Sequence, residues 1–242
     1  MAERSPQEHH RSWSAGATAD PDAEREWTSD ADGYDAWFES PWGRYAWGVE
    51  SWLVRAALEG AHGGRGLDVG CGTGRSSAML RSPGTHVVGI DPNPGMLGLA
   101  LARVDAALLA EGERLPFRDR VFDAAVAVAV LEFVREPAEV LAEIARVTRP
   151  PGRIVVGALN PRSAWGLWHR RELRSGPWAG ARFLSGRDLV RLGRVHGTVG
   201  LEEGLHAPGR LPGLERWGPV AERWGRRVRV PGAFRVLTIE RR

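Results

Sequence analysis

The chain has 242 residues, of which 43% are hydrophobic and 26% charged, with a net charge of +3, so it can form one substantial α/β domain but not two large ones. Its longest uninterrupted apolar run, Ala124–Leu131, is far shorter than a membrane span, and its polar start, MAERSPQEHH, lacks the apolar region of a secretory signal. A single cysteine excludes a disulfide framework and a multi-cysteine metal site. From these observations together we expect a cytoplasmic protein with no membrane partner and no metal.

The first 60 residues differ from the middle of the chain because they hold six of the 11 tryptophans, whereas residues 61–161 hold none. Residues 1–26 are polar with little periodicity and are predicted to be a disordered tail. A short helix then contains Tyr34 and Trp37, and Pro41 opens a second helix. We interpret residues 27–60 as a helical lid, whose second helix has an apolar face at Tyr45, Val49, Trp52, Leu53 and Ala56. Tyr45 and Trp52 are expected to pack that helix onto the sheet.

Strands and helices alternate through the middle of the chain. A continuous apolar strand such as Ala124–Val130 is typical of a sheet that is buried on both faces. The alternation therefore predicts a parallel sheet with helices on both sides. The expected strands are Gly66–Val69, His86–Ile90, Ala106–Leu109, Ala124–Val130 and Arg153–Ala158, and the expected helices are Gly74–Arg81, Asn93–Arg103 and Pro137–Val147.

The last part of the chain is basic, with 17 arginines against 7 acids in residues 162–242. We expect helices near Ser163–Arg171 and Gly186–Arg194, then a strand pair at Thr198–Glu202 and Ala233–Glu240. Such a positive charge could bind phosphate or other anions. However, the arginines are scattered and the chain has no lysine, so nucleic acid is disfavoured as a partner.

The stretch LDVGCGTG, residues 67–74, lies between the first strand and the next helix. Glycines there let the backbone touch a ligand, toward which the helix directs its free N–H groups. The dinucleotide fingerprint fails, because Arg75 and Ser77 stand where its third glycine would be required. The acid at Asp68 instead suits a ligand with an ammonium group.

Two further acids follow later strands. Asp91 ends the second strand, where a carboxylate can accept both ribose hydroxyls of a nucleoside. Glu111 and Gly112 follow the third strand, where they can contact an adenine edge by side chain and backbone.

Together these segments resemble the class I S-adenosylmethionine-dependent methyltransferases, in particular the small-molecule, methyltransferase type 11-like group. The matching stretches are LDVGCGTG, VVGIDPNPGML, EGERLPFRDRVFDAAVAVAVLEFV and IARVTRPPGRIVV. The resemblance runs over Gly66–Leu159, and more loosely to Ala233–Glu240. It implies a Rossmann-like, seven-stranded, mostly parallel sheet with an antiparallel last strand. It also implies S-adenosylmethionine as the cofactor.

The resemblance assigns cofactor roles residue by residue. Asp68 would hold the amino group, Asp91 the ribose, and Glu111 with Gly112 the adenine. Tyr34 lies where the family folds a lid. The remaining positions carried over are the loop residues Gly70, Cys71, Gly72 and Gly74, the adenine neighbours Pro92 and Met96, and Ala127 near the methyl end. Cys71 is interpreted as structural.

No catalytic residue is certain from the sequence. Glu132-Phe133 replaces the pair of histidines frequent in the family, and Pro151 replaces a glycine. A base is needed only when the acceptor must lose a proton early. The candidates are Glu132, His169 and Tyr45, and for each a structural role is the stronger interpretation.

The function expected is S-adenosylmethionine-dependent methyl transfer to a small-molecule acceptor by in-line displacement. The alternatives are methylation of RNA or protein, or S-adenosylmethionine binding without catalysis. The sequence VLEF after the fourth strand lacks the motif of base-amino methyltransferases. We place the methyltransferase domain at residues 61–242, with the cofactor core at 61–160 and the substrate side at 161–242. The acceptor, the methylated atom and the oligomeric state stay open.

Overall fold

A computed structural model describes residues 31–61, 63–169, 180–209 and 213–242. Within these residues one seven-stranded sheet has the order β3-β2-β1-β4-β5-β7-β6. Strand β7 runs antiparallel to both neighbours, and the other six strands are parallel, which confirms the predicted fold class. The strands are β1 (Gly64–Val69), β2 (Thr85–Asp91), β3 (Ala106–Leu109), β4 (Phe122–Val128), β5 (Thr148–Leu159), β6 (Thr198–Gly204) and β7 (Phe234–Glu240).

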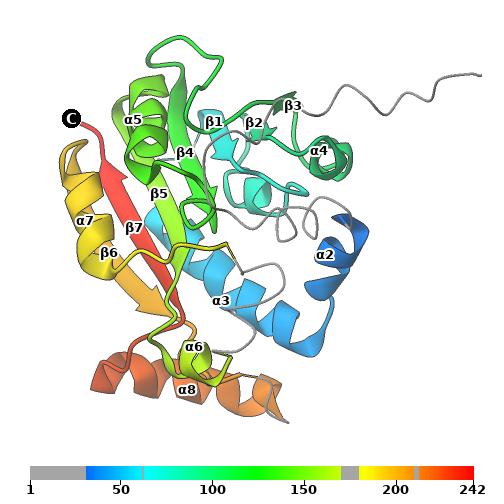
Figure 1. Cartoon of the computed structure of the whole chain (residues 1–242), viewed down its shortest axis with the longest axis vertical. Coiled ribbons are helices and arrows are strands. Elements are labelled where there is room, and N and C mark those ends of the chain that lie inside the picture. Colours follow the sequence, from blue (N-terminus) through cyan, green and yellow to red (C-terminus); the bar gives the residue numbers. More distant parts are fainter. Residues whose placement is uncertain (1–30, 62, 170–179, 210–212) are drawn as a thin grey trace, which may run out of the picture.

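Helices cover both faces of the sheet (Figure 1). On one face α5 (Pro137–Val147) and α7 (Gly186–Arg194) pack against β5, β6 and β7. On the other face α3 (Pro41–Ala57) packs against β5 and β7, while α4 (Pro94–Ala100) packs against β2 and β3. The short helices α2 (Ala31–Trp37) and α6 (Ala164–Trp168) and the long α8 (Leu214–Val228) lie around these layers.

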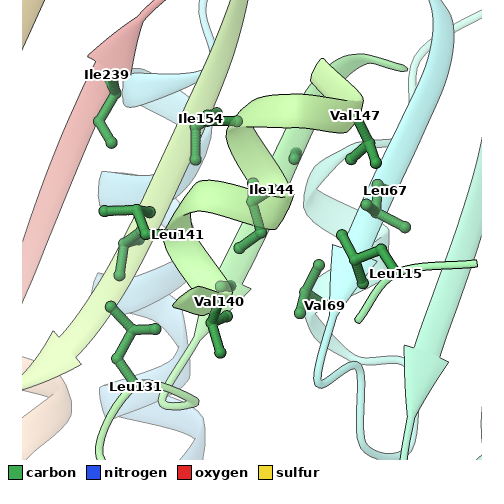
Figure 2. Close-up of a cluster of buried hydrophobic side chains, with 14 of the residues drawn as sticks. Leu67, Val69, Leu115, Leu131, Val140, Leu141, Ile144, Val147, Ile154 and Ile239 are labelled. Carbon is green, nitrogen blue, oxygen red and sulfur yellow. The ribbon is translucent and has the colours of Figure 1, made fainter. Parts of the chain in front are cut away.

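The larger core lies under α5, as Figure 2 shows. Val140, Leu141, Ile144 and Val147 recur at helical spacing and are fully buried, because they form the apolar stripe that faces the sheet. They meet Leu67 and its neighbours on the inner strands. This face is therefore closed by hydrophobic packing.

The opposite core places α3 differently from the expected orientation. Leu53 and Val54 are buried against the sheet, with Phe234 of β7 in the same cluster. Trp52 is 54% exposed, so the prediction that it packs the helix onto the sheet is wrong. The true inner face of α3 is formed by Trp42, Ala46, Leu53 and Val54.

The predicted helix Gly74–Arg81 is reduced to a four-residue 3₁₀ helix, η1 (Ser76–Met79). Two features account for its length. Gly74 has a positive φ of +83°, which delays the start, and the turn at Ser82-Pro83-Gly84 follows closely. The side chains of Ser76 and Ser77 are held by Asp68 instead of facing solvent.

Helix α8 is absent from the sequence prediction, because Gly218, Pro219 and Gly225 are poor helix formers. Tertiary packing overrides that preference. Gly218 lies against the ring of Tyr45, and Gly225 against the ring of His206, too closely for a Cβ atom at either position. The glycines thus mark helix contacts and not a loop.

Other boundaries differ by a few residues. Strand β4 begins two residues earlier than predicted, at Phe122. It also ends two residues early, at Val128, because Ala129 has a φ of +53°. Strand β5 begins five residues early, since Thr148 already pairs with Phe122. The predicted tail 1–26 and residues 170–171 of the predicted helix lie outside the described residues. No helix among the described residues is long and apolar enough to cross a membrane.

Shortening Ile144 to alanine should lower the free energy of unfolding by about 2–5 kcal/mol, because the truncation leaves a cavity under α5. Urea unfolding of Ile144→Ala would measure the loss. Val195→Ala is the control, since Val195 is 77% exposed and its truncation should change stability little. Equal effects of the two substitutions would contradict this description of the core.

Candidate functional site

The three glycines of the loop after β1 differ in what a Cβ atom at each position would contact. All three have positive φ, at +66° for Gly70, +53° for Gly72 and +83° for Gly74. A Cβ on Gly70 would lie 2.5 Å from Val130, and one on Gly74 would lie 3.1 Å from Ala100. A Cβ on Gly72 would meet only the Tyr34 ring, at 3.9 Å. Gly72 therefore offers the backbone that a ligand can approach.

Cys71 is a packing residue of this loop. It is buried, and a Cβ added to Gly89 of β2 would lie 2.8 Å from its sulfur. Burial, followed by the nearby charges of Asp68 and Asp91, raises the pKa of the Cys71 thiol. A nucleophilic thiolate is thus disfavoured, in agreement with a structural role.

Asp68, in β1, is fully buried beneath the loop. Its Oδ2 accepts hydrogen bonds from Ser76 at 2.7 Å and Ser77 at 2.6 Å. Its Oδ1 is buried without a partner. Burial raises the pKa of Asp68 to about 7. A carboxylate with one unused oxygen in this position is suited to a cationic group.

Asp91 ends β2 and is tied to the loop. Its Oδ2 accepts from the Gly72 N–H at 2.8 Å, and its Oδ1 accepts from the Asn93 N–H at 2.9 Å. Burial raises the pKa of Asp91, and the two backbone donors oppose that rise. Each carboxylate oxygen retains a further lone pair for a hydroxyl donor.

The residues predicted around adenine lie near the ends of β2 and β3. Met96 is buried on α4, whereas Pro92 and Glu111 are exposed. Gly112 lies close to both α5 and the end of β1, because a Cβ there would be 3.1 Å from Val140 and 3.4 Å from Val69. The structure therefore brings these residues to the same edge of the sheet as Asp91.

Helix α2 lies over the loop, with the ring of Tyr34 beside Gly72. Burial raises the pKa of Tyr34, and the charges of Glu50, Asp91, Asp35 and Asp68 raise it further. Ionisation of the Tyr34 hydroxyl is therefore disfavoured.

A cluster of charges holds α2 in this position. The Asp35 carboxylate accepts from Thr73 Oγ1 at 2.7 Å, from Arg75 Nε at 2.7 Å and from Arg103 Nη2 at 2.9 Å. Burial alone would raise the pKa of Asp35, but the bonds from Arg75, Arg103 and Thr73 hold it well below its usual value. Paired hydrogen bonds from arginine are strong and directional, so they fix the helix on the loop.

Glu50 was missed in the sequence analysis. It lies on α3, and its charge acts on Tyr34. Burial raises the pKa of Glu50 to about 7. Its signal in the sequence is its spacing, because it follows the buried Ala46 by four residues and precedes Val54 by four, on the inner face of the helix.

Ala127 and Glu132 lie at the end of β4 and just beyond it. The Ala127 side chain is buried in the core under α5, so only its backbone could face a ligand. Glu132 Oε1 accepts from the Leu159 N–H at 2.7 Å, while Oε2 is buried without a partner. Burial raises the pKa of Glu132 to about 7. Glu132 is thus the candidate base with an unused oxygen.

The other two candidate bases have structural contacts. The Tyr45 hydroxyl donates to Glu222 Oε1 at 2.8 Å, which joins α3 to α8. Burial and the charge of Glu222 raise the pKa of Tyr45, which disfavours its ionised form. His169 is buried, stacks on Trp165 and has Nδ1 at 2.9 Å from the Trp165 carbonyl. These contacts favour packing roles.

The sequence of this chain is similar to those of several known proteins. The sequence model of a family described as a methyltransferase domain matches residues 67–156. A protein of Methanocaldococcus jannaschii is 31% identical over 67% of this chain and 75% of its own length. A demethylmenaquinone methyltransferase of Renibacterium salmoninarum is 42% identical over 45% of this chain and 46% of its own.

The fold also has relatives among solved structures. A Thermotoga maritima protein, described as an S-adenosylmethionine-dependent methyltransferase and possible histamine N-methyltransferase, superimposes with a TM-score of 0.73 and 24% identity. The match covers 91% of this chain and 100% of that one. At this identity the likeness concerns the fold.

Replacing Glu132 by glutamine should change how stability depends on pH. Its pKa is about 7 in the folded chain, against 4.5 ordinarily, so the native state holds a proton that the unfolded chain releases. The stabilisation is complete below pH ~4 and is lost as the pH rises through 7. The stability of Glu132→Gln relative to wild type should therefore increase by about 2 kcal/mol between pH 5.5 and 8.

Urea unfolding at the two pH values would measure this difference. Glu143→Gln is the matched control, because hydrogen bonds from Arg146 outweigh burial and lower the pKa of Glu143. Its stability relative to wild type should stay nearly constant over the same interval. Parallel pH profiles for wild type and Glu132→Gln would show that Glu132 is ionised in the folded protein.

Proposed function

The chain belongs to the class I S-adenosylmethionine-dependent methyltransferases, and on this basis we propose that it methylates a small-molecule acceptor. The observation that carries the cofactor part of the proposal is the Gly72–Asp91 hydrogen bond, which joins an open loop glycine to a carboxylate at the adjacent strand end. S-adenosylmethionine, when bound, supplies an activated methyl group. The protein must then hold the cofactor and acceptor in line and exclude water.

Several features of the chain fit the cofactor. The unpartnered Oδ1 of Asp68 suits its ammonium group, either directly or through water. The remaining lone pairs of Asp91 suit the ribose hydroxyls. Glu111, with the Gly112 backbone, would contact the adenine, and Pro92 and Met96 would flank it. Gly72 would allow close approach of the methionine part beneath Tyr34.

The acidic surroundings support this assignment. The charges of Glu50, Asp91, Asp35 and Asp68 all raise the pKa of Tyr34, so the surroundings of the Tyr34 hydroxyl are acidic. S-adenosylmethionine carries both an ammonium and a sulfonium. Binding of such a cation would favour the ionised carboxylates over their protonated forms. Cofactor affinity should then rise as the pH increases toward 8.

The acceptor side is expected near the end of β4 and in residues 161–242. Glu132 lies there, buried, with Oε2 unused, and would serve as the base for an acceptor that must lose a proton. A small, uncharged acceptor is favoured by the apolar neighbours Leu131 and Leu159. The relative from Renibacterium salmoninarum is named a demethylmenaquinone methyltransferase. A cytoplasmic location is part of the same proposal.

Substitution of Asp91 tests the cofactor assignment. Asp91→Asn retains an oxygen for the loop but loses the charge, so S-adenosylhomocysteine should bind about 2 kcal/mol more weakly. Calorimetry would measure the affinity, and NAD should show no appreciable binding. Asp105→Asn is the control, because Asp105 accepts from the Val87 N–H away from the loop. Wild-type affinity in Asp91→Asn would refute the ribose assignment.

The lid role of α2 is tested by removing its anchor. Asp35→Ala breaks the bonds to Arg75 and Arg103 and should weaken S-adenosylhomocysteine binding about tenfold, because α2 loses its attachment. Asp32→Ala, an exposed change on the same helix, should have no effect. Deleting residues 1–40 should act like Asp35→Ala, whereas deleting residues 1–26 should not. Unchanged affinity in the longer deletion would leave the N-terminal aromatics as packing alone.

Turnover separates the alternatives. Transfer of a labelled methyl group should be assayed with phenol, amine and quinol acceptors, and with RNA and unfolded protein. Transfer to a small acceptor supports the proposal. Transfer to RNA or protein alone would contradict the proposal of a small-molecule acceptor. Tight cofactor binding with no transfer to any acceptor would indicate a protein that binds S-adenosylmethionine without catalysis.

A further inference from the structure

The outer sides of α3 and α8 present exposed apolar side chains among arginines. The two helices are in contact, and the Arg226 guanidinium lies 5.2 Å from the centre of the Trp52 ring. Trp224 is 64% exposed, and Val220 and Val228 about half exposed. We call this the Trp52–Trp224 surface; its main part is Val220, Arg223, Trp224, Arg227 and Val228 of α8, and Trp52 with Arg226 lies at its α3 side.

Helical spacing separates α8 into an inner and an outer face. Leu214, Gly218, Glu222 and Gly225 are buried and point toward the protein. Val220, Trp224 and Val228 recur every four residues and form one ridge on the outer side. Arg216, Arg223 and Arg227 form a row beside it. The exposed face is thus itself amphipathic.

The exposed charges of this surface are all positive among the side chains described in α3 and α8. Glu222 is buried and accepts bonds from the Leu205 and His206 backbone, and Glu50 lies on the inner face of α3 and is partly buried. Neither carboxylate offsets the arginines outside. Among the side chains whose burial is described, the exposed charged residues of the two helices are Arg44, Arg55, Arg216, Arg223, Arg226 and Arg227.

We propose that the Trp52–Trp224 surface binds an anionic phospholipid bilayer, which departs from the sequence-based expectation of no membrane partner. Arginines are attracted to anionic headgroups, tryptophan favours the boundary between headgroups and chains, and the valines can enter the apolar layer. A nucleic acid would satisfy the arginines and could stack on tryptophan, but its backbone offers nothing to the aliphatic ridge. The combination of charge and ridge therefore favours the bilayer.

The position of α8 gives this binding a defined orientation. Figure 1 shows α8 crossing the end of the sheet toward which β6 points. The parallel strands β1, β2 and β4 end in the same direction, since β6 is parallel to them. A bilayer bound at α8 would therefore lie toward the edge that carries the candidate site. The proposal itself does not depend on methyl transfer.

Sedimentation with vesicles tests the proposal. The full chain should bind vesicles of phosphatidylcholine containing about one-third phosphatidylglycerol and bind pure phosphatidylcholine poorly, with an affinity that falls as salt increases. Arg223→Glu/Arg227→Glu should reduce binding about tenfold or more. The control Arg187→Glu/Arg194→Glu makes the same charge change at exposed positions on α7 and should retain most of the binding.

A neutral substitution distinguishes a bilayer from other anions. Trp224→Ser leaves the charge intact and should weaken vesicle binding severalfold, whereas Val195→Ser, at a position that is also exposed at the end of α7, should not. Thermal unfolding would establish that all variants are folded. Absent vesicle binding, or equal losses in the α7 control, would overturn the proposal. The surface would instead be assigned to nucleic acid by two results together. Vesicle binding would be unchanged in Trp224→Ser, and binding of single-stranded RNA would be lost in Arg223→Glu/Arg227→Glu.

Discussion

The hydrogen bond from the Gly72 N–H to Asp91 sets the arrangement of the site. It connects the loop after β1 to the end of β2, and the adjacent bond from the Cys71 N–H to the Ile90 carbonyl continues the connection. The loop can follow this path only with positive φ at its glycines. Cys71 then packs on Gly89, and Asp68 is enclosed below. The ligand-binding features thus follow from one constraint on the backbone.

The same loop explains why the N-terminal helices matter. Thr73 and Arg75 extend from the loop and its continuation to meet Asp35 of α2, and Arg103 joins them after α4. Three segments that are distant in the sequence are therefore fastened by one carboxylate. Because α2 carries Tyr34 beside Gly72, this ion cluster holds the Tyr34 ring against the loop. The proposed lid and the loop are thus joined by the same ion cluster.

Buried carboxyl groups link binding to stability. Asp68, Glu50 and Glu132 each have a pKa raised to about 7 by burial, so the empty protein holds protons that it must release as the pH rises. A cationic ligand would compensate for the ionised forms of the first two. Glu132 lies apart from them and accepts a hydrogen bond from the Leu159 N–H. These buried carboxyl groups thus make the stability of the protein depend on pH.

The sequence by itself determined the parallel sheet, the glycine loop and the carboxylates Asp68 and Asp91, because strand periodicity and residues at strand ends are local signals. It did not predict α8, the inward position of Glu50 or the Asp35 cluster. Gly218 and Gly225 look like helix breakers until Tyr45 and His206 are packed on them. Likewise, Trp52 belongs to the apolar pattern of α3 but lies outside. Only the tertiary structure decided these points, because each depends on a contact between residues far apart in the chain.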